Sequence, residues 1–96
     1  MVAQVSDETR EHIEELLDEC SEEWARLPDV EREIAAWDET RALTYLAEWP
    51  LHEQHLRMLE AYAADGALTP DERQRLDRLE QLARRHRPIA QRLRGG

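Results

Sequence analysis

The sequence predicts an all-α protein, a small antiparallel bundle of four helices plus a short C-terminal helix. Apolar residues recur at steps of three and four along most of the chain, the spacing that places them on one helix face. An alternation of apolar and polar residues, which would indicate a strand, nowhere persists for more than a few positions. Proline, glycine and capping residues then divide the chain at intervals typical of helices.

The first helix is expected to begin after Ser6, because this side chain can cap it and Asp7 and Glu8 would lie near the positive end of the helix dipole. Pro28 is expected to end it. Its acidic residues mostly fill the outer arc, whereas its apolar residues form one inward stripe. That stripe consists of Ile13, Leu16, Leu17, Cys20, Trp24 and Leu27.

A second helix is predicted to follow directly, with Asp29 as its cap. Its apolar stripe shifts partway along, which predicts a kink or a new cap near Asp38. Pro50 either stops this helix or begins a third one as its first residue, and the third helix runs to about Asp65. The apolar residues before Pro50 are Val30, Ile34, Trp37, Ala42, Leu43, Leu46 and Trp49.

The clearest boundary lies between residues 66 and 72. Gly66 can adopt the left-handed conformation that closes a helix, and Thr69-Pro70-Asp71-Glu72 has the pattern of a capping box. A fourth helix should start there and be interrupted at Arg87-Pro88, before the short C-terminal helix. The inward residues expected in these two helices are Leu76, Leu79, Leu82, Ala83, His86, Ile89, Ala90 and Leu93.

The chain length favours one domain over residues 1–96, with residues 1–5 and 95–96 expected to be flexible. A core of this size is thin, so a second chain that completes it, as in a homo-oligomer, stays open. Cys20 is the only cysteine, which excludes an intramolecular disulfide. Because neither a signal peptide nor a membrane helix can be recognised, we expect a cytoplasmic protein with no membrane contact.

Charge is distributed unevenly along this acidic chain. Residues 1–40 hold fourteen acidic residues and three arginines, whereas residues 71–96 hold four acidic residues and eight arginines. The net charge of −9 argues against nucleic acid as a partner of the whole protein. We expect the C-terminal arginines to pair with the acidic first helix, with an acidic protein or nucleic acid as the alternatives for this end.

No pattern in the sequence indicates catalysis, so we predict no enzyme, no cofactor and no bound metal. Cys20 is expected to be a core residue, since Glu19 and Glu23 would disfavour its thiolate. His52 and His55 lie on one predicted helix face, one turn after Glu48. This spacing leaves a metal-binding helical bundle as an alternative function.

A protein-binding surface is the remaining interpretation. The outer face of the first helix would offer acidic side chains to a basic partner. The three tryptophans are expected to pack in the core; if one of them is exposed, it should be Trp49, which adjoins a proline and would then anchor a partner. The predicted partner-binding residues are Glu15, Asp18, Glu19, Glu22 and Trp49.

Three segments of the C-terminal half carry a resemblance: Glu48-Trp49-Pro50-Leu51, Gly66-Ala67-Leu68-Thr69-Pro70-Asp71-Glu72 and Arg87-Pro88-Ile89. This half resembles a group of short uncharacterised bacterial helical proteins that are often encoded beside a toxin or nuclease. The resemblance implies an antitoxin-like or accessory role. It assigns no active-site residue and does not extend to the acidic first helix.

The sequence therefore predicts a small acidic protein-interaction module that binds and masks a basic partner protein. Two alternatives come from other classes: the metal-binding bundle based on His52 and His55, and a DNA-binding regulator that uses the arginine-rich C-terminal helix.

Overall fold

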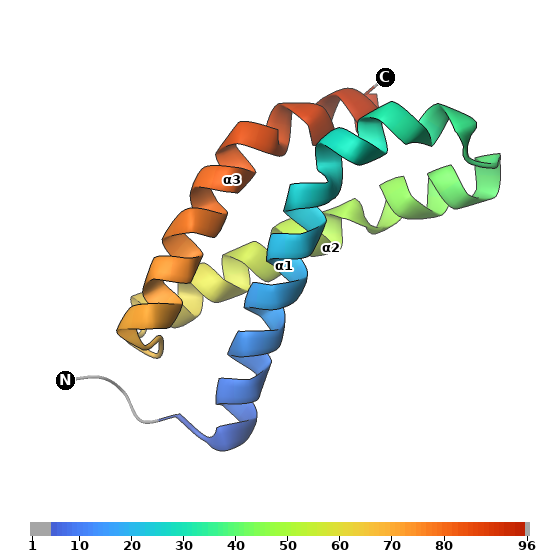
Figure 1. Cartoon of the computed structure of the whole chain (residues 1–96). Helices are drawn as coiled ribbons and strands as arrows, with labels where there is room; N and C mark the ends of the chain where they lie inside the picture. The colour runs from blue at the N-terminus through green and yellow to red at the C-terminus, as the bar shows by residue number, and fades with distance from the viewer. Residues whose placement is uncertain (1–4, 96) are drawn as a thin grey trace.

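The structure is a computed structural model and describes residues 5–95. Three long helices account for most of it: α1 (Asp7–Glu33), α2 (Glu39–Ala64) and α3 (Pro70–Gly95), with a short 3₁₀ turn, η1 (Ile34–Ala36), between the first two (Figure 1). The described residues include no strand, so the all-α prediction is confirmed. The prediction of four helices plus a short C-terminal helix is wrong. The flexibility expected at the ends falls largely on residues outside the described range.

The correction comes from the prolines, because Pro28, Pro50 and Pro88 all lie inside helices instead of ending them. A proline inside a helix leaves the carbonyl four residues earlier without its N–H donor. For Pro28 that carbonyl belongs to Trp24, and its oxygen lies 2.7 Å from Nδ1 of His86 on α3. A side chain from another helix thus replaces the missing donor, and α1 continues through Pro28 to Glu33.

The chain turns between α1 and α2 at residues 34–38. The backbone of Trp37 is extended, and the side chain of Asp38 accepts a hydrogen bond from the Arg41 N–H at 2.9 Å, as a helix cap does. The predicted new cap near Asp38 is therefore confirmed. The predicted cap at Asp29 is wrong, because α1 is continuous there.

The turn into α3 follows the sequence prediction closely. Gly66 has a φ of 74°, and Thr69 and Glu72 exchange the two hydrogen bonds of a capping box, at 2.9 and 3.1 Å. Arg10 of α1 adds a contact that the sequence did not indicate. Its guanidinium donates to the Glu72 carboxylate and, at 3.0 Å, to the carbonyl of Ala67, and so fixes this turn to the start of α1.

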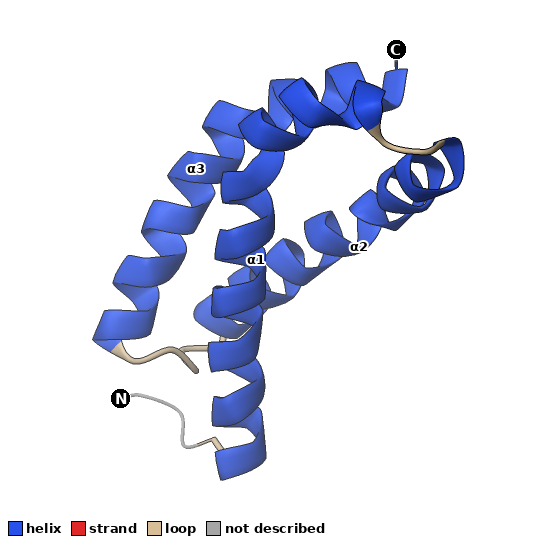
Figure 2. Cartoon of the chain, turned by 45° about the vertical axis from the view of Figure 1, so that its right-hand side comes forward, coloured by secondary structure: helices blue, strands red, loops and turns tan. Residues whose placement is uncertain are grey.

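The core lies along α1, which packs against α3 over much of its length and crosses α2 (Figures 1 and 2). Only three of the 26 residues of α2 are buried: Trp49, Leu56 and Leu59. The molecule measures 49 × 24 × 17 Å, and its radius of gyration is 15.0 Å, against about 13 Å for a compact domain of this size. The fold is therefore elongated, and much of α2 lies at its surface.

Candidate interaction surface

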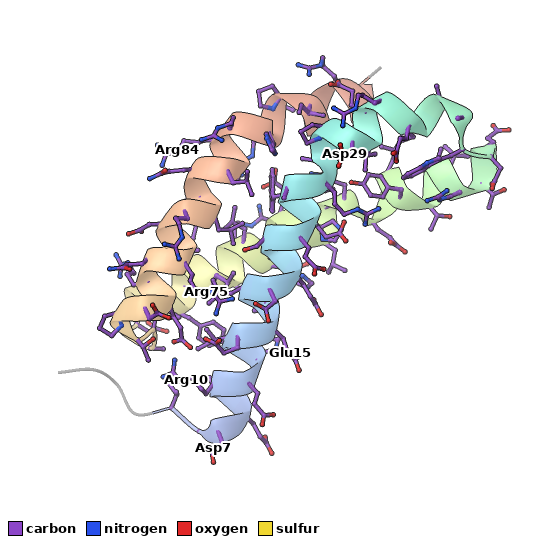
Figure 3. All side chains as sticks on the ribbon, in the orientation of Figure 1. Asp7, Arg10, Glu15, Asp29, Arg75 and Arg84 are labelled. Carbon is purple, nitrogen blue, oxygen red and sulfur yellow. The ribbon has the colours of Figure 1, made fainter. Side chains whose placement is uncertain are left out.

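A row of glutamates runs along the outer face of α1, opposite the core. Its members recur at steps of three and four, so they lie on one side of the helix over about 21 Å. All are exposed, and none forms an ion pair with another residue in the range 5–95. In Figure 3, the labelled Glu15 points away from α3. We call this row the acidic stripe; it consists of Glu8, Glu11, Glu15, Glu19 and Glu22.

Three of the four predicted acidic site residues, Glu15, Glu19 and Glu22, belong to this stripe, whereas Asp18 lies to one side of it. Arg75 of α3 reaches toward α1 (Figure 3) and donates to Asp18 at 2.5 Å and to Glu14 at 2.8 Å. The Asp18 carboxylate is thus partly neutralised within the molecule, although its side chain is 71% exposed. The free negative charge is concentrated in the stripe.

The arginines of α3 divide into two groups. Arg75 and Arg92 pair with α1, the latter with Glu31 at 3.0 Å, and Arg87 pairs with Glu53 of α2 at 2.9 Å. The expected pairing of the basic end with the acidic helix therefore holds in part. Five exposed arginines form no ion pair with a residue between 5 and 95: Arg73, Arg78, Arg84, Arg85 and Arg94.

Trp49 does not lie where a partner could touch it. Its side chain is 1% exposed and packs edge-on against Trp24, with ring centroids 4.9 Å apart. The core packing expected of the tryptophans is therefore confirmed for Trp49, and the alternative in which Trp49 is exposed and anchors a partner is wrong. The proline after it does not end the helix, so the indole stays on the inner face of α2 instead of projecting from a chain turn.

An aromatic row continues from this pair toward η1, where Tyr45 packs edge-on against Trp37 with centroids 5.5 Å apart. Three polar atoms of the row, Nε1 of Trp24, Nε1 of Trp49 and the hydroxyl of Tyr45, are buried without a hydrogen-bond partner among the described residues. Burial, with a smaller contribution from Glu23, raises the pKa of Tyr45 to about 12. Where Trp24 of α1 meets Trp49 of α2, the contact thus relies on ring packing more than on directed polar contacts.

The histidine pair offers little for a metal. The rings of His52 and His55 are 6.5 Å apart, and Nε2 of His52 is 3.9 Å from a Glu23 oxygen. Burial lowers the pKa of His52, although nearby carboxylates oppose this. No group of three histidine, cysteine, aspartate or glutamate side chains within residues 5–95 is placed to hold a metal ion.

Cys20 has the character of a core residue, as predicted. Its side chain is buried, and burial, assisted by Glu19 and Glu23, raises the pKa of the thiol to about 11. The protonated thiol is a poor nucleophile at neutral pH. Nearby, the depression between α1 and α3 is lined by Ser21, Ala25, Arg75, Arg78, Leu79 and Leu82. This set contains no base that could activate Ser21.

The sequence interpretation missed one exposed surface. Leu43 and Leu51 of α2 are 58% and 47% exposed, the two large apolar side chains most open to solvent among residues 5–95. A signal was present, because α2 carries apolar residues on two opposite faces, and a three-helix fold covers only one of them.

No helix in the described part of the chain has a segment apolar and long enough to cross a membrane. Comparison with protein-family models gave no match, and neither did comparison with curated proteins or with solved structures.

Proposed function

We propose that this protein is an interaction module whose acidic stripe binds a basic surface on a partner protein. The observation that carries the proposal is the row of five exposed glutamates without intramolecular ion pairs. Elsewhere on α1, Arg10, Arg75 and Arg92 neutralise acidic residues across the helix interfaces. The carboxylates of the stripe are therefore available to pair with a partner.

The geometry of the stripe suggests how it would act. Steps of three and four residues place one carboxylate about every 4.5–6 Å along the helix. A nucleic acid strand carries one phosphate per about 3.4 Å, so the stripe is a sparser line of the same sign. A partner surface that binds nucleic acid would be attracted to it, and occupation of that surface would mask it. This is the antitoxin-like form of the proposal.

Exposed charges of this kind steer association more than they supply affinity, because each exposed ion pair contributes about 0.2–1 kcal/mol and is screened by salt. A complex formed by the stripe should therefore associate quickly at low ionic strength and weaken as salt is added. Apolar contacts next to the stripe would have to provide the remaining affinity.

Affinity purification from the native host tests the proposal, with the tag at the N-terminus. The stripe variant Glu15→Gln/Glu19→Gln is compared with wild type and with Asp65→Asn/Asp77→Asn, which removes the same charge from exposed positions outside the stripe. We expect a basic protein to accompany wild type and the control and to be lost with the stripe variant. Equal recovery with all three proteins would contradict the proposal.

A titration of this protein with the purified partner then measures how much binding affinity the acidic stripe contributes. We expect the stripe variant to bind at least about 10-fold more weakly at low salt, equal to about 1.4 kcal/mol, and the difference to shrink as salt rises. An affinity that neither salt nor the substitutions change would exclude a role for the acidic stripe.

A second candidate function, binding of a nucleic acid by α3, is favoured by one observation. Arg84 and Arg85 are exposed and form no ion pair with a described residue, and Arg84 points away from α1 in Figure 3. The test is a mobility shift with duplex DNA. A shift that is lost in Arg84→Ala/Arg85→Ala would support this function, and no shift at low salt would exclude it.

A further inference from the structure

One face of α2 differs from the rest of the molecular surface because it is exposed and contains no charged residue. Over four turns of the helix, seven side chains point to the same side, and every one of them is exposed. Charged residues make up 36% of the chain. We call this surface the α2 outer face; it consists of Thr40, Leu43, Thr44, Ala47, Pro50, Leu51 and Gln54.

The face lies opposite the residues that hold α2 in the fold. Tyr45 and Trp49 project to the other side of the helix, where they pack against Trp37 and Trp24. Helical periodicity places the neighbouring charges, Glu39, Glu48 and Arg57, at the two edges of the outer face. An uncharged strip that exposes two leucines and has charged residues at its edges is typical of a protein interface.

The order of residues on this face is self-complementary. Leu43 and Leu51 lie four residues before and after Ala47, and Thr40 and Gln54 lie seven before and seven after it. If two α2 helices pack antiparallel with both Ala47 residues at the two-fold axis, each leucine meets the other leucine of the partner. The small Ala47 side chain lets the two helix axes approach to about 8 Å, the short end of the usual range.

Charge at the edges fits the same arrangement. The two-fold axis places Glu39 of one copy on the same edge as the partner's Arg57, at nearly the same height along the helix. The same periodicity places one unfavourable contact on the opposite edge, where the two Glu48 carboxylates meet near the axis. A partner of another kind would have no reason to match this symmetry.

We propose that the α2 outer face is the interface of a homodimer, in which two copies of this chain pack α2 against α2 antiparallel around Ala47. The dimer buries the strip that a single chain leaves in water. It also leaves the acidic stripe of α1 free. The inference does not rest on the proposed function, since it concerns another helix and another kind of contact.

Sedimentation equilibrium of the full chain, from about 10 µM to about 1 mM, tests the proposal. We expect a concentration-dependent dimer that persists in high salt, because its contacts are largely apolar. Leu43→Gln/Leu51→Gln should weaken the dimer at least 10-fold while leaving the helical circular dichroism unchanged, since both side chains are exposed in the single chain. Ala25→Gln/Ala64→Gln, exposed on other faces, should have no effect.

Disulfide cross-linking of single-cysteine variants shows which residues of the two α2 helices face each other. Ala47→Cys should form a disulfide-linked dimer under mild oxidation, because the two copies of residue 47 meet at the axis, and the buried Cys20 would not compete. Leu43→Cys alone should link poorly, and a mixture of Leu43→Cys with Leu51→Cys should link well. More efficient linkage in Leu43→Cys than in Ala47→Cys would place residue 43 against its own copy, through another register or through parallel packing, and would overturn the proposal.

The edge charges provide an independent check. Glu48→Gln should tighten the dimer and Glu39→Arg should weaken it, each by a few-fold, because the first change removes a repulsion and the second creates one with the partner's Arg57. A chain that stays monomeric up to about 1 mM overturns the proposal. A dimer that survives Leu43→Gln/Leu51→Gln would also overturn the proposal. A dimer that dissociates in high salt would do the same, because it would indicate ion pairs between α1 of one copy and α3 of the other.

Discussion

The α1–α3 and α1–α2 interfaces differ in how many of their polar atoms form hydrogen bonds or ion pairs. Against α3, α1 makes directed contacts at both ends and in the middle: Arg10 with Glu72, Arg92 with Glu31, and the Trp24 carbonyl with His86. Against α2, the ring of Trp24 packs edge-on against Trp49, and the indole N–H donors of both residues have no partner among residues 5–95.

The difference indicates that polar contacts with α1 fix the position of α3 more closely than that of α2, whose directed contact is the Arg87–Glu53 pair with α3. Hydrogen bonds and ion pairs are lost when a helix shifts, whereas ring packing tolerates small displacements. Buried donors without a partner also lower the stability of the contact in which they lie. The free apolar face also lies on α2. We therefore expect the α2 side of the molecule to be the adaptable side, and five predictions examine this contrast.

The largest effect is expected from Trp24→Ala, because this buried ring contacts Trp49 and lies under the Arg87 guanidinium. The free energy of unfolding should fall by about 3–5 kcal/mol in urea denaturation followed by circular dichroism. Trp37→Ala, at the turn before α2, is the control and should lower the free energy of unfolding by less than half as much. Equal losses would contradict a core centred on α1.

Glu72→Ala should lower the free energy of unfolding by about 2–4 kcal/mol, because it removes the capping box and leaves Arg10 without its carboxylate. Glu11→Ala, in the acidic stripe, is the control and should stay within about 0.5 kcal/mol. If both variants were equally stable, the α1–α3 contact would not depend on this polar cluster.

The Glu72 effect should depend on pH. Burial alone would raise the pKa of this carboxyl, but hydrogen bonds from Glu14 and Thr69 together with the Arg10 charge hold it below its usual value. A carboxyl with a lowered pKa stabilises the fold above its unfolded pKa and loses this contribution as pH falls through the folded pKa. The difference between wild type and Glu72→Ala should therefore shrink in acid.

His86→Phe should cost about 1–2 kcal/mol of unfolding free energy, since it leaves the Trp24 carbonyl without a donor. Pro28→Ala restores an N–H that can donate to the same oxygen. The cost of His86→Phe should accordingly be smaller in a Pro28→Ala background, and a double-mutant cycle measures this coupling. Strictly additive effects would mean that His86 does not replace the missing helix donor.

The smallest effect concerns a like-charge contact between α2 and α3. Burial and the neighbouring carboxylates of Glu60 and Asp77 raise the pKa of Glu80, against the opposing charge of Arg84. A carboxyl with a raised pKa favours the fold when protonated, and this advantage is lost as pH rises through the folded pKa. Glu80→Gln should therefore add about 0.5 kcal/mol of stability at neutral pH and nothing in acid. Destabilisation at neutral pH would contradict the assignment.

Local chemistry made several elements predictable. Ser6 accepts a hydrogen bond from the Thr9 N–H at 3.1 Å, Gly66 closes α2, and Thr69 begins α3, each as expected. These features need only residues within one helical turn of each other. The core residues of α1 were predictable for the same reason, because helical periodicity places them on one face.

The candidate surfaces were predictable only in part. The acidic stripe follows from spacing, but the neutralisation of Asp18 requires Arg75, which lies 57 residues away along the chain. The burial of Trp49 and the exposure of Leu43 depend on which face of α2 meets α1. Both faces are apolar, so periodicity could not choose between them.

By itself, the sequence determined the helical class, the acidic face of α1 and the caps at Ser6, Asp38 and Thr69, because all of these arise from neighbours along the chain. The tertiary structure decided that Pro28 lies within a helix, since His86 supplies the donor that the proline lacks. It also decided which side of α2 is covered. These outcomes depend on contacts between residues far apart in sequence, and such contacts exist only after the three helices have packed together.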